Sequence, residues 1–541
     1  MSGSPFSLAG LLYVPKRSMN LPDIFNAAAW FVDRHVAEGR GALVALECGD
    51  ERVTYQELLE RVNRLGHALR DELGVRPEER VLLLMLDGCE MAYAFFAAIK
   101  IGAVPIPTNT LWTAADYEYV LNDSGAAVLI VSEALLPAIL EIPAGRRPSL
   151  RHIVVAGDGS LATGTRALSE LMARGSVTLD AEPTSRDAPA FWLYSSGSTG
   201  SAKGCVHRQR DMVVCATLYA QGVLGLTSAD RCFSVAKLFF AYGLGNALYF
   251  PLSVGATAIL WPGLPTPADV YAVIEQHRPT LLFSVPTSYG MLLAHHRDGR
   301  DFDLSSVRQA VSAGEALPPA LFDRFKARFG VEILDGIGST EALHIFISNR
   351  PGAIRPGSSG TLVPGYEARL VDEDNRPVSP GETGNLLVKG DSTCAYYWNK
   401  PEKTRATFDG VWMRTGDKYR QDDDGFFWYA GRSDDMLKVG GIWVSPVEIE
   451  NLLAGHPAVL ECGVCGRDDR DGLTKPVAYV VLRPGIDGTS ELAAELTQFV
   501  RSRTADYKRP RWIEFIAELP KTATGKTQRF KLRERAFVIN A

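Results

Sequence analysis

The sequence predicts an α/β fold, α+β overall: a large N-terminal domain of parallel-rich sheets with flanking helices, a small β-rich subdomain, and a small mobile α+β C-terminal domain. The order of apolar strand, amphipathic helix and apolar strand repeats, as in parallel sheets with crossover helices. From Pro351 the sequence pattern changes to short expected strands separated by Gly/Pro turns. A second change comes at Gly431–Asp434, which interrupts the apolar pattern. We therefore expect domains at 1–433, with the subdomain at about 351–433, and at 434–541.

The N-terminal part carries the strongest α/β pattern. Thr54-Tyr55-Gln56-Glu57 has the sequence of a helix capping box, and apolar residues at helical spacing follow it as far as Leu69. The expected strands are 81–86, 103–106, 127–131, 153–156, 231–235, 256–261, 281–285, 307–312 and 331–334, and the expected helices 90–100, 244–252 and 268–277.

The C-terminal third is predicted to hold two smaller units. For the β-rich subdomain the expected strands are 366–371, 384–388 and 426–429. For the last unit we expect helices at 446–453 and 491–504 and strands at 477–482 and 512–515.

The composition argues against nucleic-acid or anionic-membrane binding. The chain has 541 residues, 46% of them hydrophobic, and a net charge of −6. The segment from Arg501 onward departs from this balance, with 11 Lys/Arg against 4 Asp/Glu. This basic tail is either a surface for a polyanionic ligand or a solvated helix face.

The cysteines and the apolar runs indicate a cytoplasmic protein. Eight cysteines are scattered without framework spacing, as expected of free thiols in a reducing compartment. Cys462 and Cys465 form a C-x-x-C inside an apolar strand-like run, which favours buried thiols. We find no signal-peptide pattern and no run near the ~20 apolar residues that a membrane span needs.

The stretch from Tyr194 to Gly204 combines glycines, hydroxyl side chains and Lys203 directly after an expected strand. Glycine allows close approach of the backbone, and bare N–H groups, hydroxyls and an ammonium together suit a phosphate chain. Gly204 after the lysine rules out a Walker P-loop. A flexible Ser/Gly linker is the alternative.

Two more turns follow expected strands, at 313–318 and 335–341, and turns at strand ends are where α/β sheets bind ligands. Thr340 and Glu341 suit a phosphate oxygen and Mg²⁺, although an ordinary helix N-cap has the same sequence. Asp417 would hold ribose hydroxyls or simply occupy a turn. The dense run at 431–441 is either a hinge or a solvated linker.

The motifs, in chain order, are Y-S-S-G-S-T-G-S-A-K-G (194–204), S-A-G-E-A-L-P (312–318), D-G-I-G-S-T-E (335–341), R-T-G-D (414–417), G-R-S-D-D-M-L-K-V-G-G (431–441) and P-K-T-A-T-G-K (520–526). This set resembles the adenylate-forming superfamily, which comprises acyl-CoA synthetases, adenylation domains and luciferases. The resemblance covers roughly Leu21 to Arg535.

The resemblance implies an ATP site. The residues that would surround the ATP phosphates are Ser195, Ser196, Gly197, Ser198, Thr199, Gly200 and Lys203. Thr340 would contact phosphate and Glu341 would hold Mg²⁺. The residues that would flank adenine and ribose are Gly314, Glu315, Ala316, Asp335, Gly336, Ile337, Asp417 and Arg432.

The resemblance also implies two half-reactions with different C-terminal residues. Lys526 matches the lysine of adenylate formation and Asp434 the hinge. Lys438 and Gly441 match residues used in the second half-reaction, with Gly441 beside the pantetheine tunnel.

The sequence departs from the superfamily pattern at two places, and the second departure favours an apolar acyl group. Ile337 stands where a tyrosine often stacks on adenine, and Phe239-Phe240 where many members have Phe-His. The segments 237–246 and 338–346 are similar to the benzoate-CoA ligase branch. By that similarity the aryl site is lined by Phe240, Ala241, Tyr242, Ala313, Gly338, His344 and Ile345, which in a generic α/β protein would be core residues.

We therefore expect an AMP-forming acid–thiol ligase that converts benzoate or a substituted benzoate to aroyl-AMP and then, with CoA, to aroyl-CoA. Ala342, where benzoate ligases carry Met, leaves room for an amino or hydroxyl group, as in 2-aminobenzoate (anthranilate) ligases. The alternative within enzymes loads an aryl acid onto a carrier-protein phosphopantetheine. A nucleotide-binding regulator or P-loop kinase is disfavoured by the missing Walker pattern. We expect a monomer or homodimer.

Overall fold

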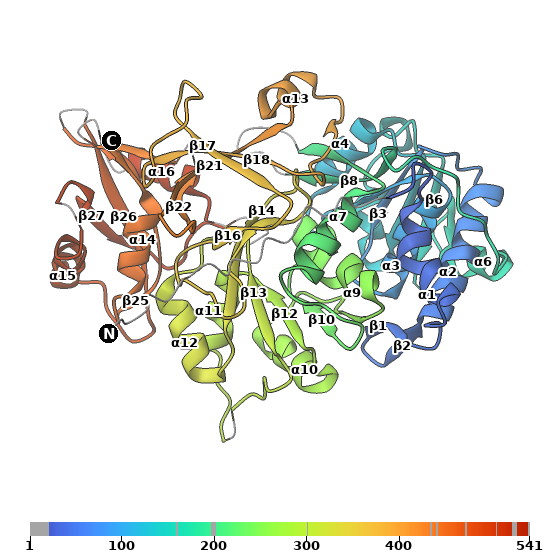
Figure 1. The fold of residues 1–541 in the computed structure, drawn as a ribbon, viewed down its shortest axis with the longest axis horizontal. Helices are drawn as coiled ribbons and strands as arrows, with labels where there is room; N and C mark the ends of the chain where they lie inside the picture. Colours follow the sequence, from blue (N-terminus) through green and yellow to red (C-terminus); the bar gives the residue numbers. More distant parts are fainter. Residues whose placement is uncertain are drawn as a thin grey trace, which may run out of the picture.

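The computed structural model describes residues 21–157, 159, 161–195, 202–299, 301–432, 435–439, 442–470, 473–504, 506–521 and 527–538. Figure 1 confirms the predicted α/β fold, with a large N-terminal part and a smaller C-terminal α+β unit. The predicted boundary at 433/434 lies outside the described residues and stays a prediction. None of the described helices combines the length and the apolar character that a membrane crossing requires.

A five-stranded parallel sheet forms the first part of the fold. Its order is β4 (Val104–Pro107), β3 (Arg80–Leu84), β5 (Val128–Ser132), β6 (His152–Ala156) and β7 (Thr165–Ala167). Its helices are α2 (Tyr55–His67), α3 (Cys89–Lys100), α4 (Ala114–Ser124), α5 (Leu136–Leu140) and α6 (Leu168–Arg174). The predicted capping box is present at α2, where the Thr54 hydroxyl accepts from the Glu57 N–H at 3.2 Å.

Alternate residues of β3 face two different cores. Leu82 and Leu84 pack with α4 and α5, whereas Val81 and Leu83 pack with α2 and α3. A strand covered on both faces needs apolar residues at every position, which explains the uninterrupted apolar run there.

The second sheet has nine strands, and its carboxyl edge carries the candidate site. Its order is β16 (Thr361–Leu362), β15 (Ile345–Ser348), β14 (Ile333–Gly338), β13 (Gln309–Ser312), β12 (Leu281–Ser284), β10 (Arg231–Ser234), β11 (Thr257–Leu260), β1 (Val44–Cys48) and β2 (Glu51–Thr54). The strands from β14 to β1 are mutually parallel, and β15, β16 and β2 are antiparallel edges.

The main hydrophobic core lies between the two sheets. It joins residues of β3 and β5 to Phe283 of β12, Val311 of β13 and Leu334 of β14. The outer face of the nine-stranded sheet is covered by α10 (Pro267–His277), α11 (Pro286–Ala294) and α12 (Pro319–Phe329). The predicted helix at 244–252 lies in a longer continuous helical segment. It consists of α8 (Ala241–Leu244), the π-helical η6 (Gly245–Tyr249) and α9 (Phe250–Val254).

A three-stranded sheet connects the large sheets to the rest of the chain. It consists of β8 (Pro189–Ser195), β9 (Lys203–Arg208) and β19 (Tyr396–Tyr397), all antiparallel, and β8 lies beside β4. After β9 the chain enters α7 (Asp211–Cys215) and η5 (Ala216–Gln221).

The strands expected in the β-rich subdomain are present and belong to one five-stranded sheet, whereas β16 and β19 of the same range pair with other sheets. The five-stranded sheet pairs β17 (Glu367–Val371), β18 (Thr383–Lys389), β21 (Trp412–Gln421), β20 (Phe408–Asp409) and β22 (Phe427–Arg432), with α13 (Pro401–Thr407) beside β19. All eight cysteines of the chain are free, as predicted. Of the C-x-x-C pair, Cys465 is buried as expected, whereas Cys462 is only half-buried.

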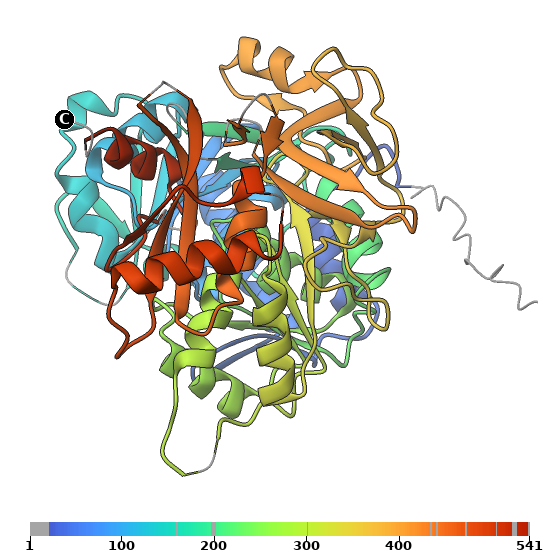
Figure 2. The ribbon, with the colours of Figure 1, turned by 90° about the vertical axis from the view of Figure 1, so that its left-hand side faces the viewer.

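The C-terminal unit is drawn in orange and red, and Figure 2 shows it in front of the larger part. A hairpin of β23 (Leu437–Val439) and β24 (Ile442–Val444) precedes the sheet of β25 (Val459–Asp468), β26 (Thr474–Leu482) and β27 (Trp512–Phe515). Its helices are α14 (Pro446–Ala454), α15 (Ser490–Arg501) and α16 (Arg529–Val538), and α14 packs against β22.

The predicted glycine turn at 335–338 is wrong in one respect. Gly336, Ile337 and Gly338 continue β14, and the turn comes only after them, at 339–344. Glycine is needed because β15 approaches closely: a Cβ at Gly338 would lie 2.6 Å from the His344 carbonyl oxygen. The helix N-cap interpretation of Thr340 is also wrong, because the chain continues into β15 rather than a helix.

Candidate active site

The glycine-rich stretch at 194–204 joins the two strands of an antiparallel hairpin. Ser195 ends β8, Lys203 begins β9, and the two residues are directly paired. The stretch is therefore a hairpin connection and does not link separate units. The predicted phosphate-binding residues Ser196, Gly197, Ser198, Thr199 and Gly200 lie outside the described residues.

The structure brings Glu341 to the ends of this hairpin. The Ser195 hydroxyl lies 3.4 Å from Glu341 Oε1, and the Tyr397 hydroxyl donates to the same oxygen at 2.7 Å. Lys203 Nζ lies 3.5 Å from the Tyr397 hydroxyl. The Lys203 ammonium, the hydroxyls of Ser195 and Tyr397, and the Glu341 carboxylate therefore lie together. The sequence motifs placed Ser195, Lys203 and Glu341 in one site but gave no indication of Tyr397.

His207 holds the backbone of Thr340, the residue before Glu341. His207 Nε2 lies 2.8 Å from the Thr340 carbonyl oxygen, an atom that only accepts, so Nε2 is the donor. The other ring nitrogen lies 3.2 Å from Asp211 Oδ2, and the ring stacks on Phe191. With His207 and Asp211 fully buried, this arrangement fixes the turn that carries Thr340 and Glu341.

The predicted adenine residues surround the carboxyl ends of β13 and β14. Asp335 is buried, and its Oδ2 accepts from the Leu317 N–H at 3.4 Å. Glu315 accepts from the Thr287 hydroxyl at 3.0 Å, and Gly314 has a φ of +90°, which favours glycine. Ala316 lies in the same turn and Ile337 is half-buried on β14. Burial raises the pKa of Asp335 to about 8.

The raised pKa of Asp335 makes folding stability depend on pH. Asp335 has a pKa of about 8 in the folded protein and 3.8 as an ordinary Asp. The folded state therefore holds a proton that the unfolded state has lost, and the free energy of unfolding falls as the pH rises from about 4 to about 8. We expect Asp335→Asn to raise the melting temperature by about 2 °C near pH 8 and to leave it unchanged near pH 4.

Scanning calorimetry from acid to alkaline pH checks this expectation. Asp303→Asn is the matched control: the hydroxyl and N–H of Ser305 hold the pKa of Asp303 low, so the carboxylate stays charged and the difference between this variant and wild type should be constant from about pH 5 to alkaline pH. If the difference in melting temperature between wild type and Asp335→Asn were the same at every pH, the assignment of a buried protonated carboxyl would be contradicted.

Asp417 and Arg432 form a separate pair on neighbouring strands. They are cross-strand partners of β21 and β22, and Arg432 Nη1 lies 3.2 Å from Asp417 Oδ1. Gly416 before Asp417 has a φ of +77°, so the strand is distorted there. Asp417 is thus part of a strand, and the simple turn interpretation is wrong.

Two of the predicted aryl residues, Tyr242 and His344, lie in an aromatic cluster with Tyr219 and Phe250, which were not predicted. The rings of Tyr219, Tyr242 and Phe250 lie 5.5, 5.5 and 4.4 Å from the His344 ring. The Tyr242 hydroxyl donates to backbone carbonyls at the ends of β12 and β13, at 3.2 and 3.1 Å. Of the other predicted aryl residues, Phe240 is at the start of α8, Ala241 and Ala313 are buried, and Gly338 is directly paired with Ile345.

His344 is held in one tautomer. Its Nε2 lies 3.1 Å from Asn246 Oδ1 and 3.3 Å from the Tyr242 carbonyl oxygen, both acceptors, so Nε2 carries the proton. Burial lowers the pKa of His344 to about 3, so the ring is neutral. Its Nδ1 is buried and has no hydrogen-bond partner among the described residues.

Most of the predicted C-terminal site residues fall outside the description. Lys526, Asp434 and Gly441 are not among the described residues, and of Lys438 only its place in β23 is described. Their neighbours are informative: Asp435 pairs with Arg529 at 3.4 Å and with Arg533 at 2.9 Å.

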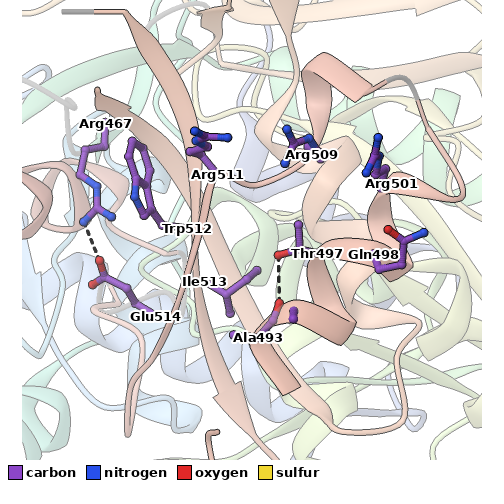
Figure 3. Close-up of a pocket in the computed structure, with 11 residues that line it drawn as sticks. Arg467, Ala493, Thr497, Gln498, Arg501, Arg509, Arg511, Trp512, Ile513 and Glu514 are labelled. Atoms are coloured by element: carbon purple, nitrogen blue, oxygen red, sulfur yellow. Dashed lines mark hydrogen bonds and ion pairs between the residues drawn. The ribbon is translucent and has the colours of Figure 1, made fainter. Parts of the chain in front are cut away.

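The C-terminal unit also carries a basic pocket of about 440 Å³ (Figure 3). It lies between α15 and β27, and its charged lining is Arg467, Arg501, Arg509, Arg511 and Glu514. Trp512 lines it too, and Arg467 pairs with Glu514 within the pocket. Three arginines of the basic tail, Arg501, Arg509 and Arg511, thus line the same pocket.

Sequence reasoning missed Tyr397, His207, Asp211 and Asn246, and also Tyr219 and Phe250 beside His344. His207 follows the glycine-rich stretch on β9, four residues before Asp211, but that spacing has no specific meaning without the fold. Tyr397 and Asn246 had no local signal that sets them apart from other polar or aromatic residues.

Comparison with known proteins agrees with this geometry. The family model of AMP-binding enzymes matches residues 33–398, and the model of the AMP-binding enzyme C-terminal domain matches 448–526. Benzoate–CoA ligase of Thauera aromatica is 50% identical over 95% of this chain and 97% of the relative. Anthranilate–CoA ligase of Pseudomonas aeruginosa is 35% identical over 96% of each chain.

Solved structures show the same fold over almost the whole chain. The anthranilate CoA ligase AuaEII in complex with anthranoyl-AMP superposes with a TM-score of 0.92 at 46% identity, covering 96% of this chain and 99% of that one. A benzoate CoA ligase from Burkholderia xenovorans LB400 superposes with a TM-score of 0.87 at 46% identity, covering 94% and 100%. The chain therefore belongs to the AMP-binding enzyme family.

Proposed function

We propose that this protein is an AMP-forming aryl-CoA ligase that activates benzoate or an amino- or hydroxybenzoate with ATP and transfers the aroyl group to CoA. One observation carries the proposal. The short segment from Thr340 to Ile345 has Glu341 at one end, in contact with Ser195, and His344 at the other end, inside the aromatic cluster. The residue proposed to hold the Mg²⁺ of Mg·ATP and a residue of the proposed aryl site are thus only a few positions apart. Relatives that bear benzoate and anthranilate ligase names support this pairing.

His344 supports an acid with a hydrogen-bond donor on the ring. Its unprotonated Nδ1 is a buried acceptor without a partner in the described part of the chain, and leaving such an atom unpaired is costly. An amino or hydroxyl group on the substrate ring would satisfy it. Anthranilate and hydroxybenzoates are therefore proposed beside benzoate.

Ala342 is a less direct determinant than the sequence suggests. It is fully buried, and its carbonyl oxygen accepts from the Ser392 hydroxyl at 2.8 Å. A methionine there would have to displace packed neighbours, so Ala342→Met changes core packing as well as any space near the ring.

The residues present fit a magnesium ion. Both hydroxyl contacts to Glu341 fall on Oε1, and no described residue hydrogen-bonds Oε2. Mg²⁺ prefers oxygen ligands and commonly takes one carboxylate together with substrate phosphates. When bound, the ion would neutralise charge on the ATP phosphates as pyrophosphate leaves.

The first half-reaction forms aroyl-AMP. A carboxylate oxygen of the acid attacks the α-phosphorus of ATP, and the bond from that phosphorus to the bridging oxygen breaks, which releases pyrophosphate. We propose that Lys203 and the backbone of the glycine-rich stretch bind the phosphates, and that Lys526 approaches both the carboxylate and the α-phosphate, where a fixed cation stabilises the developing charge.

In the second half-reaction the CoA sulfur attacks the acyl carbon. The bond between that carbon and the phosphate oxygen breaks, AMP leaves, and the thiol proton passes to solvent. The pocket lined by Arg501, Arg509 and Arg511 supports CoA as the acceptor, because the nucleotide end of CoA carries several phosphates. Arg501 and Arg509 share the carboxylate of Asp506, so Arg511 would be the main phosphate contact. Loading of a carrier-protein phosphopantetheine is the remaining alternative.

The test is ATP–pyrophosphate exchange with benzoate, anthranilate, hydroxybenzoates, cinnamate and short fatty acids, repeated with CoA while thioester is followed. Exchange with a benzoate and CoA-dependent thioester would support the proposal and identify the acid. Exchange without thioester would favour the carrier alternative. Absence of exchange with every acid would contradict the proposed function.

A charge reversal in the basic pocket separates CoA from simpler thiols. We expect Arg511→Glu to raise the KM for CoA about tenfold or more, because an arginine–phosphate contact becomes a repulsion. Pyrophosphate exchange, and aroyl transfer to free pantetheine, should stay at the wild-type rate. Arg483→Glu, on the same unit but outside the pocket, is the control. An equal loss with CoA and pantetheine would show that the pocket does not recognise the nucleotide.

A further inference from the structure

Tyr397 stands between the two opposite charges of the proposed phosphate site. Its hydroxyl donates to Glu341 Oε1 at 2.7 Å. Lys203 Nζ lies 3.5 Å from the same hydroxyl and 4.4 Å from the centroid of the tyrosine ring. The carboxylate thus meets the polar edge of Tyr397, and the ammonium lies over its electron-rich face.

The position of Tyr397 is set by structure on every side. It lies on β19, directly paired with Cys205 of β9, and its N–H donates to the Thr404 hydroxyl at 3.1 Å. The ring is 3% exposed and packs beside Phe408. A phenol keeps its proton at neutral pH, so the hydroxyl is the donor in its contact with Glu341.

Lys203 and Glu341 do not form an ion pair within 4.0 Å, although both are described and both contact Tyr397. Opposite charges this close in a half-buried site attract strongly. A direct pair would cancel the cation meant for phosphate and cover the carboxylate meant for the metal. Something must therefore hold them apart before the nucleotide arrives.

We propose that Tyr397 is a positioning residue that keeps Lys203 and Glu341 apart and oriented, so that each is available to the Mg·ATP complex. The inference rests on the proposed assignment of this site to Mg·ATP. The hydroxyl directs Glu341 through Oε1 and leaves Oε2 toward the metal, and the ring face holds the ammonium by a cation–π contact. Tyr397 acts through these two residues and does not itself take part in the chemistry.

The deciding experiment compares Tyr397→Phe with wild type by calorimetric titration with Mg·ATP and, separately, with AMP, in the absence of any acid. The phenyl ring preserves packing and the cation–π face but lacks the donor. We expect the Kd for Mg·ATP to rise about tenfold or more, as is typical when a hydrogen bond to a charged group is lost. The Kd for AMP, which has no β- and γ-phosphates, should stay within about twofold of the wild-type value.

Tyr396→Phe is the matched control, because it removes a hydroxyl from the neighbouring position of β19, on a side chain that is 38% exposed. It should leave both dissociation constants unchanged. The double variant Glu341→Gln/Tyr397→Phe should bind Mg·ATP no more weakly than Glu341→Gln alone, since the carboxylate that Tyr397 orients is already gone. The melting temperature of unliganded Tyr397→Phe should equal that of wild type.

Three results would overturn the inference. One is an unchanged Kd for Mg·ATP in Tyr397→Phe, and another is an equal loss of AMP and Mg·ATP affinity with a lowered melting temperature, which would mean a general structural role. The third is a full tenfold effect in the Glu341→Gln background. If the wild-type protein bound no Mg·ATP at all, the assignment of the site itself would be wrong, which is a distinguishable result.

Discussion

Lys526→Ala is expected to abolish adenylate formation while leaving thioester formation from supplied aroyl-AMP. In the first half-reaction negative charge accumulates between the acid carboxylate and the α-phosphate, and an ammonium placed there is worth at least about 100-fold in rate. In the second half-reaction the bond to phosphorus is already made, so the same lysine has no charge to stabilise. Pyrophosphate exchange and single-turnover conversion of synthetic benzoyl-AMP or anthranoyl-AMP measure the two steps separately.

Lys521→Ala is the control for this prediction. It removes another lysine of the same segment, one that is paired with Glu461 at 2.6 Å and has no proposed role in the reaction. Both half-reactions should proceed at wild-type rates in this variant. A loss of both steps in Lys526→Ala, or of neither, would show that Lys526 does not belong specifically to adenylate formation.

Asp434→Pro is expected to have the opposite pattern, with adenylation largely intact and thioester formation reduced by tenfold or more, on the order of 1.4 kcal/mol in the barrier. Proline fixes its own φ and restricts the residue before it, so it would prevent a rotation of the chain at this position. One site that uses Lys526 first and Lys438 and Gly441 later needs such a rotation.

The contacts beyond position 434 explain why a rotation there would move the whole C-terminal unit. Asp435 pairs with Arg529 and Arg533 of α16, and Arg529 pairs with Glu450 of α14 at 2.6 Å. The first residue after the proposed hinge is thus tied to the helix that follows the Lys526 segment. We infer that this charged cluster makes the unit turn as one body.

Asp434→Ala is the matched control, because it removes the same carboxylate without restricting the backbone. It should retain thioester formation close to the wild-type rate. If the alanine variant lost the second step as severely as the proline variant, the carboxylate and not the backbone freedom would be the essential feature. Equal loss of both half-reactions in Asp434→Pro would argue against domain alternation.

The sequence alone determined the fold class, the order of the elements and the class of reaction. Apolar runs long enough for strands and amphipathic spacing long enough for helices are local properties, so β3, α3 and β12 could be placed within a few residues. The residues proposed to bind phosphate and Mg²⁺, such as Lys203, Thr340 and Glu341, also stand in short motifs whose order along the chain is specific. A local pattern is sufficient wherever the interaction it encodes is local.

Only the tertiary structure decided which side chains complete the site. Tyr397 is 56 residues from Glu341 in the chain, and His207 is 133 residues from Thr340. Their contacts exist because β19 pairs with β9 and because β15 turns back along β14. Strand pairing between distant segments is set by the packing of the whole core, and the spacing of residues along one segment carries no information about it. The placement of Tyr397 between Lys203 and Glu341 is therefore a property of the fold and cannot be read from the positions of the three residues in the sequence.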